Sequence, residues 1–235
     1  MGQAIGIVTE SGFGKSTSIG KNEELGIIGL PPNETAIINV KNKALPFKNW
    51  KKDYGKKISE GGNYAFVTDA PTIGKIVNII NNDRPDIKYL VIDDFQYIMA
   101  EEFVNNALKP GFDKFSRLAK NIYELITLIN ATREDLMVFI LTHSDEKKIG
   151  NEESFKMKTI GKMLDEKVTL EGLFTILLYG KQSYDTSERK ASKHYVTNYD
   201  GTYPAKSPHG MFKELYILND LFLVAKAVRE YENEE

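Results

Sequence analysis

The 235-residue sequence contains no cysteine, which excludes disulfide bonds, zinc–thiolate sites and cysteine nucleophiles. No apolar run approaches the roughly 20 residues that a membrane-spanning helix needs. The start of the sequence has no charged segment followed by an apolar one, so we expect neither secretion nor a membrane partner. The formal net charge is only −2, so attraction of the whole molecule to nucleic acid is not expected. These absences fit a cytoplasmic protein.

Apolar runs and amphipathic segments alternate along the chain. Continuous apolar runs predict buried strands at residues 3–8, 35–40, 88–94, 135–143 and 173–179. Apolar side chains recur at helical spacing in residues 70–82 and 113–131. Such strands, separated by amphipathic helices, are typical of a mostly parallel α/β sheet. Because no repeat or linker is evident, we expect a single domain over residues 1–235.

The C-terminal part of the sequence carries signals for further elements. Asp200-Gly201 lies between aromatic and β-branched residues and predicts a β-hairpin over residues 194–207. A strand over residues 212–218 should follow. We then expect a helix from about Asp220, with Asn219 as its cap.

Residues 8–17, VTESGFGKST, combine glycines with a Gly-Lys-Ser triplet. Glycine lets backbone amides curl around phosphate oxygens, a lysine reaches the β- and γ-phosphates, and a Ser or Thr hydroxyl holds magnesium. Lys15 is therefore the expected catalytic cation and Ser16 an expected magnesium ligand. A helix beginning at Lys15 should aim its N-terminal dipole at the anion. The expected nucleotide-binding residues are Glu10, Ser11, Gly12, Phe13, Gly14, Lys15, Ser16 and Thr17.

Thr9 stands where the pattern G-x-x-x-x-G-K-[ST] has its first glycine. This position leaves the preceding strand, so its side chain need not contact phosphate. The alternative interpretation is a Gly-rich turn between a strand and a helix that binds nothing. A second, acidic signature favours the nucleotide site.

That signature is LVIDDF, residues 90–95, in which two aspartates end an apolar strand. Asp93 is expected to hold magnesium through water, together with Ser16. Asp94 should point to the other side of the chain and could polarise the attacking water. Alternatively, the strand merely ends at a polar turn. A Gly-rich loop followed by such a strand about 80 residues later is nevertheless typical of nucleoside triphosphatases.

The apolar strand at 135–143 ends in Thr142 and His143. In a parallel sheet this polar end lies on the phosphate side. Either side chain could therefore sense the γ-phosphate, and we count His143 among the catalytic candidates. The alternative is a polar strand end that simply meets water.

In this order, the loop, the acidic strand, the Thr-His strand and the hairpin resemble the RecA-like ATPases of bacteriophages. The resemblance is greatest to the small phage ATPases associated with single-strand annealing and recombination. It extends from residue 8 to about residue 212 and includes ESGFGKST, YLVIDDFQY, FILTHSDE, TIGKMLDEKVTLEGLFTILLYG and HYVTNYDGTYPAKSPHGMF.

The resemblance implies a RecA-like P-loop core with a mostly parallel sheet, flanking helices and a C-terminal β-hairpin. It implies that the chain binds ATP and Mg²⁺ and hydrolyses ATP with stimulation by DNA. It also implies a homo-oligomer, either a ring or a filament, in the cytoplasm of a host cell if a phage encodes the chain.

The chain departs from RecA at the catalytic carboxylate, which RecA carries after an earlier strand. Here the corresponding stretch reads IINVKNKALPF and offers no Glu, which shifts the expected base to Asp94. In the resembling family, a basic residue near Lys206 can reach the γ-phosphate of a neighbouring subunit. The alternative for Lys206 is one exposed lysine among many.

Single-stranded DNA is the partner that the resemblance implies, and a single-strand-binding protein is a further one. The hydrophilic segments 144–160 and 180–193, which we expect to be loops, correspond to loops that face DNA in RecA-like proteins. The second segment holds the DNA-binding candidates Lys181, Arg189, Lys190 and Lys193. Residues 41–57 hold seven lysines against one aspartate, with aromatic residues between them. They either contact DNA or form a basic loop whose aromatic side chains anchor it to the core.

The leading hypothesis is an ATPase that acts on single-stranded DNA in recombination or annealing. One alternative is a ring motor or helicase loader that acts on a protein or on duplex DNA, and another is a nucleotide-gated binding protein with negligible turnover. A nucleoside kinase usually clamps its second phosphoryl group with several lid arginines. Arginines are few and scattered here, so this hypothesis ranks lower.

Overall fold

The computed structural model describes residues 2–108, 111, 113–149, 152–160, 164, 168–185 and 190–233. Its strands are β1 (Gln3–Thr9), β2 (Thr35–Asn39), β3 (Tyr64–Phe66), β4 (Tyr89–Asp93), β5 (Met137–Ile149), β6 (Glu152–Met157), β7 (Ile176–Asp185), β8 (Lys190–Val196) and β9 (Tyr216–Leu218). Its α-helices are α1 (Trp50–Asp53), α2 (Ala70–Asp83), α3 (Gln96–Asn105), α4 (Asp113–Asn130) and α5 (Leu221–Asn233). Within these ranges, no helix is both long and apolar enough to cross a membrane.

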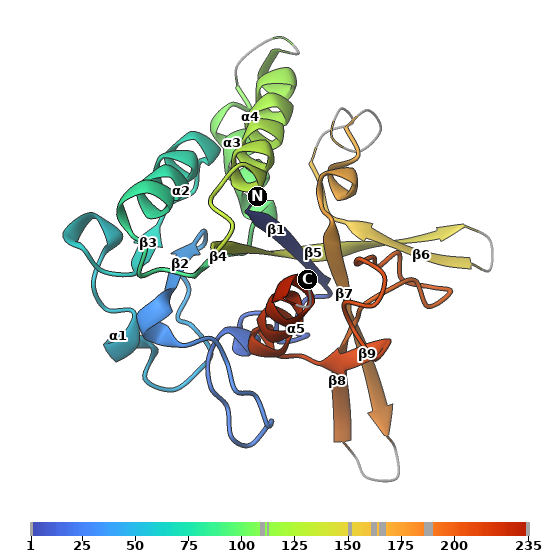
Figure 1. Ribbon diagram of the computed structural model, residues 1–235. Coiled ribbons are helices and arrows are strands. Elements are labelled where there is room, and N and C mark those ends of the chain that lie inside the picture. The colour runs from blue at the N-terminus through green and yellow to red at the C-terminus, as the bar shows by residue number, and fades with distance from the viewer. Residues whose placement is uncertain are drawn as a thin grey trace.

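The strands form one mixed sheet in the order β3-β2-β4-β5-β1-β7-β8-β9, with β6 paired to β5 (Figure 1). All pairings from β3 through β7 are parallel. The strands β6, β8 and β9 pair antiparallel with their neighbours. The central strands are apolar throughout because both faces of the sheet are covered. This confirms the expected α/β class, a mostly parallel sheet with flanking helices.

Two apolar layers lie on opposite faces of the sheet. On one face, Ile73 of α2 and Ile122 of α4 belong to a buried cluster. On the other face, Leu221 and Val224 of α5 belong to a second cluster. Figure 1 shows α2, α3 and α4 gathered on one side of the sheet and α5 on the other.

The helix predicted to begin at Lys15 does not form, and that prediction is wrong. The loop leads only into a three-residue 3-10 helix, Thr17–Ile19. Gly20 then lies against the Phe47 ring without space for a Cβ atom, and the N–H of Leu30 returns to donate to Ile19 O at 2.8 Å. Glycines at these turns disfavour a continuous helix. The C-terminal helix α5 packs on this part of the sheet instead.

Antiparallel strands do occupy the C-terminal side of the sheet, but the predicted turn is wrong. β8 ends at Val196, before Asp200-Gly201. The Asp200 carboxylate accepts hydrogen bonds from the N–H groups of Thr202 and Tyr203 at 3.0 and 2.9 Å. Aspartate often closes a local turn in this way, so residues 194–207 do not form a hairpin. The antiparallel pairs are β7–β8 and β8–β9.

Three other boundaries also differ from the sequence predictions. The hydrophilic segments expected to be loops are largely strands, because β5–β6 and β7–β8 continue to pair beyond the parallel core. The last strand is limited to Tyr216–Leu218. Asp220 caps α5 in place of Asn219, since it accepts from the N–H of Phe222 at 2.9 Å.

The basic segment at residues 41–57 is anchored by its aromatic side chains. Phe47 and Tyr54 are buried and meet edge to face with ring centroids 6.0 Å apart. Trp50 packs against the same apolar cluster. This is the anchoring arrangement that the sequence allowed as one of two interpretations.

Candidate active site

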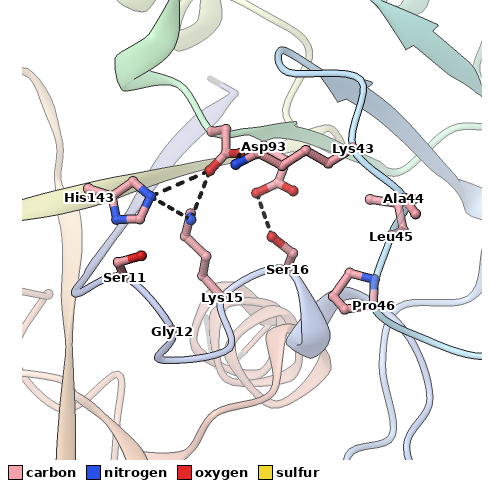
Figure 2. A pocket seen from close by; sticks show the side chains of 11 residues that line it. Ser11, Gly12, Lys15, Ser16, Lys43, Ala44, Leu45, Pro46, Asp93 and His143 are labelled. Carbon is pink, nitrogen blue, oxygen red and sulfur yellow. Dashed lines mark hydrogen bonds and ion pairs between the residues drawn. The ribbon is translucent and has the colours of Figure 1, made fainter.

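The carboxyl ends of β1, β2 and β4 meet the middle of β5 at one edge of the parallel part of the sheet. The register pairs Thr9 of β1 with His143 of β5, and Asn39 of β2 with Asp93 of β4. Adjacent strands lie about 5 Å apart. The Gly-rich loop after β1 therefore comes close to Asp93 and Asp94 at the end of β4 and to His143 in the middle of β5. Together with residues 43–46 they line a cavity of about 230 Å³ (Figure 2).

The loop between β1 and the 3-10 helix is open toward this cavity. Gly12 and Gly14 have φ angles of 81° and 100°, a conformation that glycine adopts without strain. No atom lies within 4 Å of the point where a Cβ of Gly12 would stand. The Phe13 side chain turns away into the core, 6.0 Å from the Tyr195 ring, so only its backbone can contact a ligand.

The magnesium ligands that the sequence predicts lie in contact with each other. The Ser16 hydroxyl donates to Asp93 Oδ1 at 3.0 Å. Burial raises the pKa of the Asp93 carboxyl, and the neighbouring Asp94 charge adds to this rise. A hydroxyl beside a buried carboxylate suits a hard cation. Ser16 and Asp93 therefore fit Mg²⁺.

These two side chains do not make a complete metal cage. No group of three or more His, Asp or Glu side chains in the described part of the chain could hold a metal ion. Mg²⁺ commonly uses only one or two protein carboxylates and takes its other ligands from phosphate and water. The site therefore suits Mg²⁺ that arrives with a phosphate group.

Asp94 is surrounded by positive groups. Lys15 Nζ lies 2.8 Å from its Oδ1 atom, and Lys43 Nζ lies 2.9 Å from its Oδ2 atom. Burial alone would raise the pKa of Asp94, but hydrogen bonds and charge from His143, Lys15 and Lys43 hold it well below the ordinary value. Such a carboxylate is a weak proton acceptor. In this arrangement Asp94 is a counter-ion, and its use as a base stays a prediction.

His143 also belongs to this cluster, whereas Thr142 does not. His143 Nε2 is 3.1 Å from Lys15 Nζ and 3.6 Å from Asp94 Oδ1. Thr142 is completely buried, and its hydroxyl lies 3.3 Å from Gln96 Oε1. The γ-phosphate sensor is therefore expected to be His143 alone.

Sequence reasoning missed two residues at this site, Lys43 and Gln96. Lys43 is one of many lysines in residues 41–57, and no spacing signal separates it from the others. Gln96, at the start of α3, accepts from the backbone N–H of His143 at 3.2 Å and orients this part of β5. A single glutamine after LVIDDF offers no pattern by which its position could be recognised.

A larger cavity of about 960 Å³ adjoins the first. Leu45 and Pro46 line both. Trp50 and Phe222 line the larger cavity but not the smaller one. The lining of the larger cavity is therefore the more apolar of the two. A ligand with a charged part and a flat apolar part could use both.

The DNA-binding candidates have different surroundings. Lys181 Nζ pairs with Asp200 Oδ2 at 2.9 Å and lies 4.7 Å from the Tyr216 ring centroid. Lys193 Nζ donates to the backbone oxygen of Gly12 at 2.9 Å, so this lysine touches the phosphate loop. Lys190 begins β8; its side chain, like the whole of Arg189, lies outside the described residues.

Within a single chain, Lys206 is not part of the 230 Å³ cavity. Its backbone forms a bridge with Leu177, which pairs with Gly6 in the middle of β1. The expectation that it reaches a neighbouring subunit therefore stays a prediction.

No protein-family model matches the chain, and no curated protein matches it. Among solved structures, a KaiC-like protein from the hyperthermophilic archaeon Pyrococcus horikoshii OT3 is similar, with 14% sequence identity and a TM-score of 0.44. The similarity covers 83% of this chain and 78% of that one. Conclusions about chemistry therefore rest on the residues of this chain and their geometry.

Proposed function

We propose that the chain is an ATPase that binds ATP with Mg²⁺ at the loop of residues 10–17. The proposal rests on one observation: the Ser16 hydroxyl contacts Asp93 beside the Lys15 ammonium, at the mouth of an open glycine-rich loop. A cation, a hydroxyl and a carboxylate in this arrangement are the groups that phosphoryl transfer needs. The adjoining larger cavity, which shares Leu45 and Pro46, offers room for the nucleoside.

Each side chain has a distinct role in this proposal. Lys15 binds the β- and γ-phosphates, while Ser16 and Asp93 hold Mg²⁺, which neutralises phosphate charge when bound. His143 contacts the terminal phosphate. When Lys15 turns from Asp94 to the phosphates, Asp94 loses a positive partner, and its carboxylate becomes a better proton acceptor for the attacking water.

The decisive test is ATP turnover by Lys15→Ala. We expect turnover to fall by at least about 100-fold, because the lysine charge stabilises the transferring phosphoryl group. Lys120→Ala is the control, since Lys120 is exposed on α4, pairs loosely with Glu124 at 3.6 Å and lines neither cavity. A folded Lys15→Ala protein that hydrolyses ATP at the normal rate would contradict the proposal.

We also propose that single-stranded DNA is the partner that this ATPase acts on, as a homo-oligomer in recombination or annealing. Exposed tyrosines on the antiparallel side of the sheet support this, namely Tyr184 and Tyr216. Aromatic faces can stack on unpaired bases while nearby lysines meet phosphates. A ring motor or loader that acts on a protein or duplex DNA is the alternative.

A further inference from the structure

Lys43 lies in the same cavity as Lys15, although it belongs to no phosphate-loop pattern. The two lysines bind opposite oxygens of one carboxylate: Lys15 Nζ is 2.8 Å from Asp94 Oδ1, and Lys43 Nζ is 2.9 Å from Asp94 Oδ2. The Lys43 side chain is 59% exposed, whereas that of Asp94 is 6% exposed. Lys43 therefore reaches from an exposed position to a buried anion.

The backbone around Lys43 is held in place. The buried Asn39 side chain at the end of β2 donates from Nδ2 to Lys43 O at 2.7 Å. The Lys43 ammonium also lies 5.2 Å from the ring centroid of Tyr97. Lys41, two residues earlier, pairs instead with Glu101 at 2.6 Å. Of these neighbouring lysines, it is Lys43 that lines the 230 Å³ cavity.

We infer that Lys43 is a second phosphate-binding lysine, which acts within the same chain and recognises the terminal phosphate of a bound nucleoside triphosphate. The inference rests on the proposed ATPase function. A phosphate oxygen offers the lysine the same kind of charge-assisted hydrogen bond as the Asp94 carboxylate. Lys43 can therefore exchange one anion for the other with a small change of side-chain position.

Charge balance explains why a second lysine is useful there. A triphosphate with Mg²⁺ keeps negative charge that Lys15 alone does not neutralise, and a diphosphate keeps less. Lys43 and Lys15 both pair with the Asp94 carboxylate, so their ammonium groups lie close together. Lys43 is therefore near the part of the cavity that the terminal phosphate would fill. Lys43 should therefore discriminate between triphosphate and diphosphate.

The experiment compares binding of Mg²⁺ complexes of adenylyl imidodiphosphate, a non-hydrolysable ATP analogue, and ADP by calorimetry. Lys43→Met should weaken binding of the analogue about tenfold, the size of one charge-assisted hydrogen bond, and change ADP binding by less than about twofold. Lys43→Arg should retain the preference for triphosphate because it keeps the charge. The control Lys41→Met should bind both nucleotides as the parent protein does.

Other results would overturn the inference. If Lys43→Met weakens both nucleotides equally or leaves both unchanged, Lys43 only neutralises Asp94. If it tightens both, Lys43 obstructs the cavity. In each of these cases the ATPase proposal survives, provided that Lys15→Ala still lowers ATP turnover as predicted above. A parent protein that binds neither nucleotide would overturn the proposed function and the inference together.

Discussion

Asp94 adopts a backbone conformation that is uncommon for a residue with a side chain. Its φ angle is 64°, in the left-handed region, where a non-glycine residue costs roughly 1 kcal/mol or more. The conformation turns its carboxylate toward Lys15 and Lys43, away from the apolar core. Asp93, one residue earlier, ends the strand and faces Ser16. Adjacent aspartates thus have separate partners, as the sequence predicts.

Asp93→Asn should stabilise the nucleotide-free protein while weakening Mg²⁺-dependent nucleotide binding. Burial raises the pKa of Asp93 in the folded state, so its ionisation at neutral pH opposes folding. Asparagine keeps an oxygen that accepts from Ser16 and removes the buried charge. We expect a gain of about 1 kcal/mol, which is about 2–4 °C in melting temperature for a chain of this size.

The dependence on pH gives this prediction a distinctive sign. Because the folded-state pKa is raised, the parent protein loses stability as pH rises through that pKa, so the gain from Asp93→Asn should shrink as the pH is lowered. Asp86→Asn is the opposite control, since a hydrogen bond from Arg84 lowers the pKa of Asp86. Its replacement should slightly destabilise the protein at neutral pH. Melting curves between pH 4 and pH 8 would contradict the argument if both variants changed stability in the same direction.

At the scale of elements, the segment between the loop and β2 is held by contacts with α5. The buried Asp220 carboxylate, just before α5, accepts from the N–H groups of Ile28 and Gly29 at 2.7 and 3.2 Å. It also accepts from the N–H of Phe222 at the start of α5. In addition, Asn219 Nδ2 donates to Gly14 O at 3.2 Å. The start of the C-terminal helix therefore supports the phosphate loop. It takes over the role that the sequence assigned to a helix beginning at Lys15.

Asp220→Ala should lower the free energy of unfolding by about 2–3 kcal/mol, because it leaves buried N–H groups without an acceptor. Glu230→Ala, on the same helix, is the control. Glu230 is exposed and pairs only loosely with Lys226 at 3.6 Å, so its loss should change stability by about 0.5 kcal/mol or less. Urea denaturation measures the free energy of unfolding of both variants. If Asp220→Ala is as stable as Glu230→Ala, Asp220 does not anchor the segment.

At the scale of the whole molecule, the charge is nearly balanced while the antiparallel side of the sheet presents aromatic and basic side chains. The net charge of −2 gives no general attraction to DNA. Lys193, one of the predicted DNA contacts, touches the Gly12 backbone. A ligand at β8 could therefore affect the phosphate loop directly, which would link a partner to the nucleotide site.

Single-stranded DNA should bind more tightly with the non-hydrolysable ATP analogue than without it, and the affinity should fall steeply with salt. The pair Arg189→Ala/Lys190→Ala should weaken binding of an oligothymidylate while leaving basal ATP turnover unchanged. Lys193 is kept because it contacts the loop. The control pair Lys75→Ala/Lys120→Ala removes equal charge from the exposed surfaces of α2 and α4.

Fluorescence anisotropy over a salt series, with the oligomer size measured in parallel, checks this prediction. If nucleotide leaves DNA affinity unchanged and both variant pairs behave as the parent protein, the DNA proposal is wrong. The motor or loader that acts on a protein or on duplex DNA would then be the better hypothesis. The ATPase proposal would be unaffected, because it rests on the loop and Asp93.

The sequence by itself determined the central strands and the core of the site. Short apolar, β-branched runs favour strands covered on both faces, and Gly12, Lys15, Ser16 and Asp93 carry their chemistry in local motifs. Only the tertiary structure decided which helix supports the loop and which lysine joins Lys15. Lys43 and Asp94 are 51 residues apart in the chain, and Asp220 meets Ile28 across 192 residues. Contacts of this range depend on the complete arrangement of strands, so local patterns do not encode them.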